Sequence, residues 1–182
     1  LHRVDRRQRQ MCIRDRLLLD KIVQKTDKYP SLWQERILIR TASALHDIGK
    51  IGIDEAILNK PGRLTAEDFA SMKAHTTFGA DMLRNLPRYQ EERLLQLAIE
   101  ICRWHHERYD GKGYPDGLVG DEIPISAQLV SIADVYDALT SERVYKKAFS
   151  HEKAMQMIRE GECGAFNPLL LSCLEEIADE LQ

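Results

Sequence analysis

The chain has 182 residues, of which 43% are hydrophobic, so its length and composition suit one globular domain with its own core. It has no apolar run near the ~20 residues that a membrane-spanning helix needs, and no secretory signal follows its charged start. The formal net charge is −3, with +4 in residues 1–16 and therefore −7 in the rest, which argues against a nucleic-acid polymer as partner. We expect a soluble, cytoplasmic domain without a membrane segment.

The first sixteen residues do not read as part of this domain. Residues 6–15, RRQRQMCIRD, match the translation of a transposase sequencing adapter, and the run shows no amphipathic period. We predict that residues 1–16 are non-native and that the domain covers residues 17–182. The alternative is a native basic arm that binds RNA or anionic lipid.

Helical patterns begin directly after this segment. Residues 17–28 have an apolar side that predicts one helix, and Ser31 begins a capping-box pattern that predicts the start of another. The apolar face of this second helix continues to residue 48, and Gly49 is the expected stop. The adjacent pair His46 and Asp47 would then lie in its last turn.

Further helices carry the remaining motifs. Thr65 begins a second capping-box pattern, whose helix leads at helical spacing to His75. The clearest helix runs from Glu91 to Glu107, where His105 extends the apolar stripe. After a glycine-rich loop, another helix ends at Thr140 and carries Asp134 among apolar neighbours.

Two helices complete the chain, one capped by Ser150 and one capped by Asn167 with proline at its first turn. No stretch alternates apolar and polar residues as a half-buried strand does, and no internal repeat is present. The predicted fold class is therefore all-α, a compact bundle of roughly seven helices.

Four short motifs hold metal-seeking side chains. They contain His46, Asp47, His75, His105, His106 and Asp134. Imidazole binds Fe, Mn or Zn, and a carboxylate can bridge two ions, so the pattern indicates two or more metal ions inside the bundle. The alternatives are a structural hydrogen bond within the pair His46 and Asp47, a satisfied core histidine at position 75, and a salt bridge or cap at Asp134.

Basic and aromatic residues near these motifs suit an anionic substrate. Lys50 follows the first motif and is a candidate to face a phosphate, while Arg143 and Lys146 could clamp a phosphate or a base. Tyr114 and Pro115 lie between glycines in a rigid turn whose aromatic ring could wall a pocket. The alternatives are a solvated lysine at a helix end, a solvated basic face and a plain loop.

From about Leu17 onward, several motifs occur in a specific order: ALHDIGKIGI, ILNKPGRLT, MKAHTTFGADML, WHHERYDGKGYPDGL and IADVYDALTSERVYK. Together they resemble the HD-GYP family of metal-dependent phosphodiesterases. The resemblance implies an HD-domain-like hydrolase of bacterial second-messenger signalling. Its substrate would be cyclic di-GMP, cleaved to linear pGpG and, in some members, to GMP.

The resemblance also implies roles for single residues. All of the metal-seeking residues above would be ligands, with Asp47 bridging two ions. Two or three divalent ions are expected, and Fe or Mn suits the mixed imidazole and carboxylate set better than Mg. Asp47 and Lys50 would be the catalytic residues, and Lys50, Arg143, Lys146 and Tyr114 would contact the substrate.

Partners follow from the same likeness. The loop Gly113-Tyr114-Pro115 would border the site and dock a partner such as a diguanylate cyclase-type domain. Domains of this family usually follow a receiver or sensor domain in the same protein. We expect the same arrangement in the parent of this chain.

Two departures from the family pattern matter. The family usually has a further His, and often a Glu, upstream of the HD pair, where this chain has its arginine-rich run. If residues 1–16 are non-native, the chain is N-terminally truncated, and we expect incomplete metal binding and weak activity. Asn167 stands where the family often has Asp, with little expected effect because both residues cap helices. The alternatives are an HD hydrolase of another cyclic dinucleotide and a non-catalytic docking module.

Overall fold

The computed structural model describes residues 14, 16–142 and 147–181, and within them it is helical without a strand, which confirms the predicted all-α class. A helical segment over residues 16–25 comes first. The α-helices that follow are α2 (Leu32–Ser43), α3 (Glu55–Leu58), α4 (Ala66–Lys73), α5 (His75–Arg84), α6 (Arg93–Trp104), α7 (Ile125–Thr140), α8 (His151–Arg159) and α9 (Pro168–Glu176). Short 3₁₀ turns are η1 (Ile48–Gly52), η2 (Pro87–Tyr89), η3 (Gly120–Glu122) and η4 (Ala178–Leu181).

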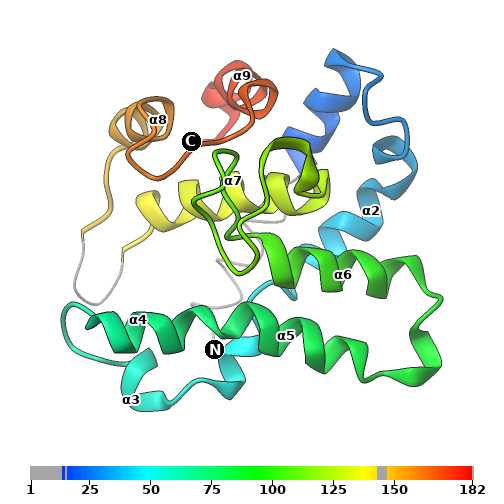
Figure 1. The fold of residues 1–182 in the computed structure, drawn as a ribbon. Helices are drawn as coiled ribbons and strands as arrows, with labels where there is room; N and C mark the ends of the chain where they lie inside the picture. The colour runs from blue at the N-terminus through cyan, green and yellow to red at the C-terminus, as the bar shows by residue number, and fades with distance from the viewer. Residues whose placement is uncertain (1–13, 15, 143–146, 182) are drawn as a thin grey trace.

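Helix α7 is the centre of the bundle. It runs between α4 and α5 on one side and α8 and α9 on the other, with α6 alongside (Figure 1). Every residue from 126 to 133 is buried, so this part of α7 has no face toward solvent. Its apolar side chains join those of α2, α6, α8 and α9 in one core. Among the described residues, no helix is long and apolar enough to cross a bilayer.

Local capping signals succeeded at some helices and failed at one. The Thr65 hydroxyl accepts from the Asp68 N–H at 3.1 Å, while the Asp68 carboxylate accepts from the Thr65 N–H at 2.8 Å, so this predicted capping box is confirmed. Asn167 caps α9 as expected. The capping box predicted at Ser31 is wrong. Its backbone is already helical, with φ −73° and ψ −22°, so its hydroxyl makes no cap hydrogen bond.

The turn after α2 positions the first predicted motif. Helix α2 ends at Ser43, so His46 and Asp47 follow the helix and do not lie in its last turn. The next residues pack closely on α5, because a Cβ added to Gly49 would lie 1.9 Å from the His75 carbonyl oxygen. Only glycine permits this backbone approach, which brings the HD pair next to His75.

Helix α6 ends earlier than expected. The prediction of a helix from Glu91 to Glu107 is too long, since α6 covers only Arg93–Trp104. His105 is its C-cap residue, and the Glu107 N–H closes a tighter turn by donating to the Trp104 carbonyl at 2.9 Å. The chain then turns into the glycine-rich loop, so His105 and His106 lie where the helix gives way to the loop.

Candidate metal centre

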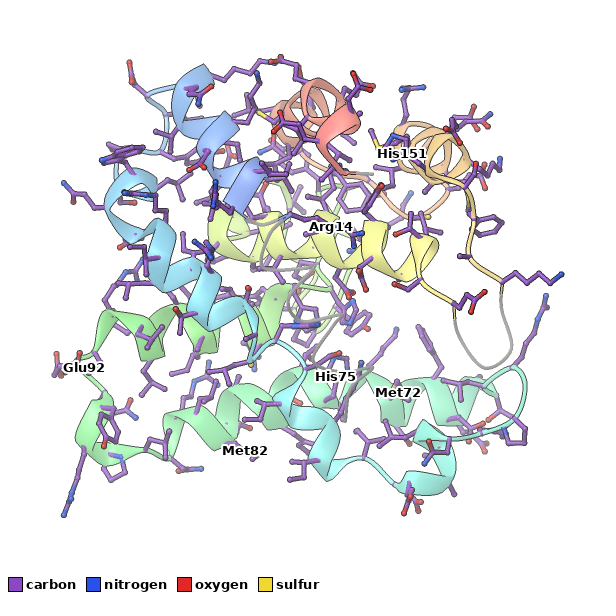
Figure 2. All side chains as sticks on the ribbon, turned by 180° about the vertical axis from the view of Figure 1, so that it is seen from behind. Arg14, Met72, His75, Met82, Glu92 and His151 are labelled. Atoms are coloured by element: carbon purple, nitrogen blue, oxygen red, sulfur yellow. The ribbon has the colours of Figure 1, made fainter. Side chains whose placement is uncertain are left out.

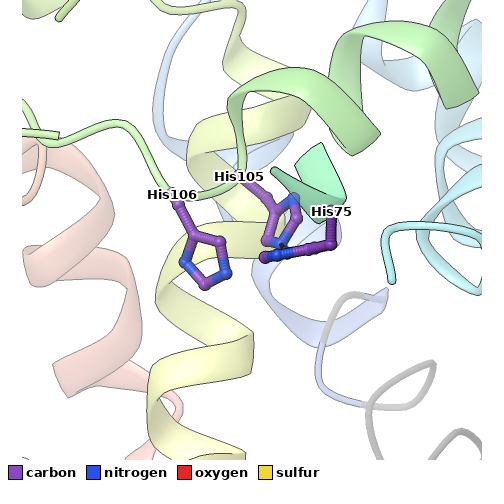
Figure 3. A group of neighbouring side chains, drawn as sticks. All are labelled: His75, His105 and His106. Atoms are coloured by element: carbon purple, nitrogen blue, oxygen red, sulfur yellow. Dashed lines mark hydrogen bonds between the residues drawn. The ribbon is translucent and has the colours of Figure 1, made fainter. Parts of the chain in front are cut away.

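Four separate segments bring the predicted ligands together. The turn after α2 supplies His46 and Asp47, the start of α5 supplies His75, the end of α6 supplies His105 and His106, and the middle of α7 supplies Asp134. The rings of His75, His105 and His106 converge on one point (Figure 3). The structure therefore gathers all six residues into one cluster.

Asp47 lies between the histidines. Its Oδ1 is 3.5 Å from His75 Nε2 and 4.0 Å from His105 Nε2, while its Oδ2 is 3.3 Å from His46 Nε2. The two carboxylate oxygens thus face different imidazoles, as a carboxylate that bridges two ions must. Asp134 adds a further carboxylate, with Oδ1 3.9 Å from His46 Nε2.

The donor atoms form two overlapping groups. The imidazole group consists of His75, His105 and His106, and the mixed group consists of His46, Asp47 and His105. Within each group, one ligand atom from every residue lies within 4.8 Å of the others. Both groups contain His105, whose Nε2 can bind only one cation at a time, so they describe adjacent and overlapping positions for a cation.

Backbone carbonyls set the tautomers of three of the imidazoles. In each of three rings, Nδ1 lies within hydrogen-bond distance of a backbone carbonyl oxygen. The pairs are His46 with Ser43 at 2.8 Å, His75 with Met72 at 2.6 Å, and His105 with Ile101 at 2.9 Å. A carbonyl only accepts, so Nδ1 donates and, in the neutral ring, Nε2 presents its lone pair to the cluster. Figure 2 shows Met72 and His75 on neighbouring turns of the chain.

The Nε2 atoms of His75 and His105 are only 3.5 Å apart. Two lone pairs at this distance repel each other unless a positive charge lies between or beside them. A neutral imidazole with Nδ1 held by a backbone carbonyl is also the usual form of a histidine metal ligand. The donor set of this structure therefore fits bound metal ions.

The electrostatics of the two groups differ. Burial lowers the pKa of His75, His105 and His106, in the last case to about 2, so these rings are neutral at pH 7. Burial would also lower the pKa of His46, but the hydrogen bond to Asp47 and the charges of Asp47 and Asp134 raise it to about 9. The mixed group thus concentrates negative charge that favours a cation.

Lys50 lies at the edge of this centre, with its side chain partly exposed. Its Nζ contacts Oδ2 of Asp47, and although burial alone would raise the pKa of that carboxyl, His46 and Lys50 hold it well below its usual range. Its predicted contact with a substrate phosphate stays a prediction. Arg143 and Lys146, the other predicted substrate cations, lie outside the described residues.

The loop of residues 110–119 closes one side of the cluster. The Tyr114 ring stacks on His106, with centroids 4.8 Å apart and planes 25° from parallel. The buried Glu107 carboxylate accepts hydrogen bonds from the backbone N–H groups of residues 116–118 at 2.7–3.1 Å. Sequence reasoning missed this role of Glu107, although an acid directly after two buried histidines was a signal.

The same loop is also held from outside. Arg103 donates two hydrogen bonds of 2.8 Å to the Asp116 carboxylate, and Trp104 Nε1 donates a third of 2.7 Å. A Cβ on Gly113 would lie 2.3 Å from Glu107 Cα, so only glycine fits where the loop crosses this turn. The end of α6 thus positions both the histidines and the loop that covers them.

Comparison with known proteins identifies a family whose members this chain resembles in sequence. A family model described as "HD domain" matches residues 2–168. A cyclic di-GMP phosphodiesterase of Vibrio cholerae is 44% identical over 144 residues, which are 79% of this chain and 29% of the relative. A 3′3′-cGAMP-specific phosphodiesterase 2 of the same species is 42% identical over 146 residues, 80% of this chain and 27% of the relative. The chain thus spans under a third of the length of either relative.

A solved structure shows the same fold. Bd1817, described as a HDG"Y"P protein from Bdellovibrio bacteriovorus, superposes with a TM-score of 0.62 over 93% of this chain and 51% of that chain, at 23% sequence identity. Together with the curated relatives, this match confirms the resemblance to HD-GYP phosphodiesterases. The family match begins at residue 2, inside the segment whose non-native origin stays a prediction.

Proposed function

Since this chain belongs to the HD domain family, we propose that it is a metal-dependent phosphodiesterase that hydrolyses a cyclic dinucleotide, with cyclic di-GMP as first candidate. The observation that carries this proposal is the position of Asp47, whose two oxygens face the imidazoles of both donor groups. Two adjacent divalent positions joined by a carboxylate suit in-line displacement at phosphorus. The names of the relatives supply the substrate class.

The metal ions are proposed from the donors. Imidazole nitrogens dominate, so Fe or Mn suits the centre better than Mg, which prefers oxygen ligands and retains its water. The imidazole group would hold one ion, and His46, Asp47 and Asp134 would hold the second, because His105 Nε2 can bind only one ion. When bound, such ions lower the pKa of a coordinated water and neutralise the charge of the phosphate.

Side chains of this protein would bind the substrate and stabilise the charge that develops during hydrolysis. Hydrolysis adds one water across a phosphodiester: the P–O3′ bond breaks, the 3′ oxygen takes a proton, and linear pGpG results. A second hydrolysis would give GMP. We propose that Lys50, next to Asp47, stabilises the negative charge that develops on the phosphate, and that Arg143 and Lys146 contact the substrate.

A second candidate substrate is 3′3′-cGAMP. The relative named for it is 42% identical, and the one named for cyclic di-GMP is 44% identical, a difference too small to choose between them. A non-catalytic docking module is the alternative of another class. For the parent protein we also propose a cytoplasmic location, an upstream receiver or sensor domain, and docking of a diguanylate cyclase-type domain on Gly113-Tyr114-Pro115.

The direct test uses the whole chain loaded with Mn²⁺, or anaerobically with Fe²⁺. Metal content is measured by mass spectrometry, and conversion of cyclic di-GMP and 3′3′-cGAMP is followed by chromatography. We expect pGpG to form, and His105→Ala to lower the rate at least about 100-fold because it removes a donor from both groups. Trp33→Ala, an exposed change on α2, is the control. Metal binding without turnover of either dinucleotide would favour the docking module.

A further inference from the structure

A cluster of aromatic side chains lies beside the metal centre. The proposed metal and phosphate contacts leave most of this cluster without a role. It consists of Phe69 and Lys73 on α4 and Tyr114 in the loop, and we call it the α4 cluster. Lys73 Nζ lies 4.9 Å from the centroid of the Phe69 ring and 5.1 Å from that of Tyr114. The two rings meet edge to face, with centroids 6.5 Å apart and planes at 78°.

This cluster is exposed and not part of the core. Phe69 is 47% exposed, and α4 has no buried residue at all. Among the described residues, Lys73 forms no ion pair. Its ammonium group therefore lies next to two aromatic rings and not next to a carboxylate. A half-exposed ring beside an ammonium without an acidic partner is an arrangement that fits a flat, polar, aromatic ligand.

The cluster is also adjacent to the proposed reaction site. Tyr114 stacks on His106 of the imidazole group. Lys73 directly follows Met72, whose carbonyl holds Nδ1 of His75. A ligand with a phosphate at the metal centre would therefore have its attached base near Phe69.

We propose that Phe69, Lys73 and Tyr114 form a subsite for a purine base of the cyclic dinucleotide. The base stacks on Phe69, as bases stack on aromatic side chains in single-stranded nucleic-acid binding proteins. The Lys73 ammonium donates to the acceptor edge of the base, where guanine presents N7 and O6 and adenine presents N7. This inference rests on the proposed function and adds the recognition of the base.

The experiment compares two substrates in Mn²⁺-loaded protein. Cyclic di-GMP carries purines, while glycerophosphocholine is a small diester without any aromatic ring. We expect Phe69→Ala to lower kcat/KM for cyclic di-GMP about 10-fold, mainly by raising KM, and to leave the small diester within about 2-fold. Lys73→Met should act in the same direction, and Phe69→Trp should restore activity because it keeps a stacking face.

A matched control exists on α2. Trp33 is 55% exposed with the Arg36 guanidinium 4.0 Å from its ring centroid, which makes it an aromatic and cation pair away from the metal centre. Trp33→Ala should leave kcat/KM unchanged for both substrates. Metal content and melting temperature are measured for every variant, and we expect both to match the wild type in Phe69→Ala.

The outcomes separate this inference from the proposed function. If the wild type cleaves cyclic di-GMP and Phe69→Ala cleaves it equally well, the subsite is wrong and the function stands. If Phe69→Ala loses metal or slows both substrates equally, Phe69 only supports the fold and the subsite is again wrong. If the wild type cleaves the small diester but no cyclic dinucleotide, the proposed substrate and the subsite both fail.

Discussion

The imidazole group and the mixed group are neighbours that share His105, yet they differ in charge. In the imidazole group, burial lowers the pKa of every member, so three neutral rings face one another. In the mixed group, the carboxylates offset the same burial and raise the pKa of His46 to about 9. Both groups lie beside Asp47, but the mixed group also has Asp134 nearby, so more negative charge favours a cation there.

This difference shows how one fold can offer two unlike positions a few ångströms apart. Backbone carbonyls orient His46, His75 and His105 in the same way, so the protein holds the rings by a common device. What differs is Asp134, which approaches the His46 side, whereas Asp47 turns one oxygen toward each group. Variants can remove the carboxylate, each ring or the loop in turn.

The largest effect is expected for Asp47→Asn. The amide keeps the shape of the side chain but removes the charge and one bridging oxygen, so the two groups lose their common carboxylate. We expect activity to fall at least about 100-fold, with loss of about one metal ion per chain. Metal analysis and cyclic di-GMP hydrolysis measure both. Wild-type activity in this variant would contradict the bridging role.

A direct comparison of the groups comes from His106→Ala and His46→Ala. The first leaves the imidazole position with His75, His105 and one oxygen of Asp47, whereas the second leaves the carboxylates of Asp47 and Asp134 beside the mixed position. We therefore expect the larger loss of metal affinity in His106→Ala, with each affinity falling about 10- to 100-fold. Titration with Mn²⁺ under identical conditions decides, and equal losses would show that the carboxylates add little.

A smaller effect is expected for Glu107→Gln. The amide retains one acceptor oxygen but turns an NH₂ group toward the backbone N–H groups of residues 116–118. An unsatisfied buried donor costs about 1–3 kcal/mol, so urea unfolding should show a loss of this size. Because the loop carries Tyr114, we also expect KM for cyclic di-GMP to rise. Glu162→Gln, an exposed change, is the control, and an unchanged stability in Glu107→Gln would argue against the clamp.

The smallest effect lies outside the centre, at Asp68. Its hydrogen bond with Lys60, followed by those with Thr65, lowers the pKa of the Asp68 carboxyl to about 2. A carboxyl with a lower pKa in the folded state stabilises the protein above its unfolded value of about 4, and this contribution is lost as the pH falls through about 2. The melting temperature of Asp68→Asn should therefore be slightly below wild type at pH 7, and the difference should shrink toward pH 2. A constant difference would show that ionisation of Asp68 is not the cause.

The sequence alone determined those features that depend on neighbours along the chain. The capping box at Thr65 and the cap at Asn167 were predictable because each joins residues at most three positions apart. The candidate ligands could be named because histidines and aspartates in helical motifs have few structural uses, and the structure brings all of them together. The failure at Ser31 has a local cause too, since the backbone of Ser31 itself is already helical.

Only the tertiary structure decided how distant segments meet. The approach of Gly49 to α5 places Asp47 beside His75, and no pattern along the chain encodes that distance. The clamp of Glu107 on the loop and the approach of Phe69 to Tyr114 likewise join residues from different segments. Such contacts depend on how helices pack around α7, because packing fixes distances between side chains that sequence spacing leaves free.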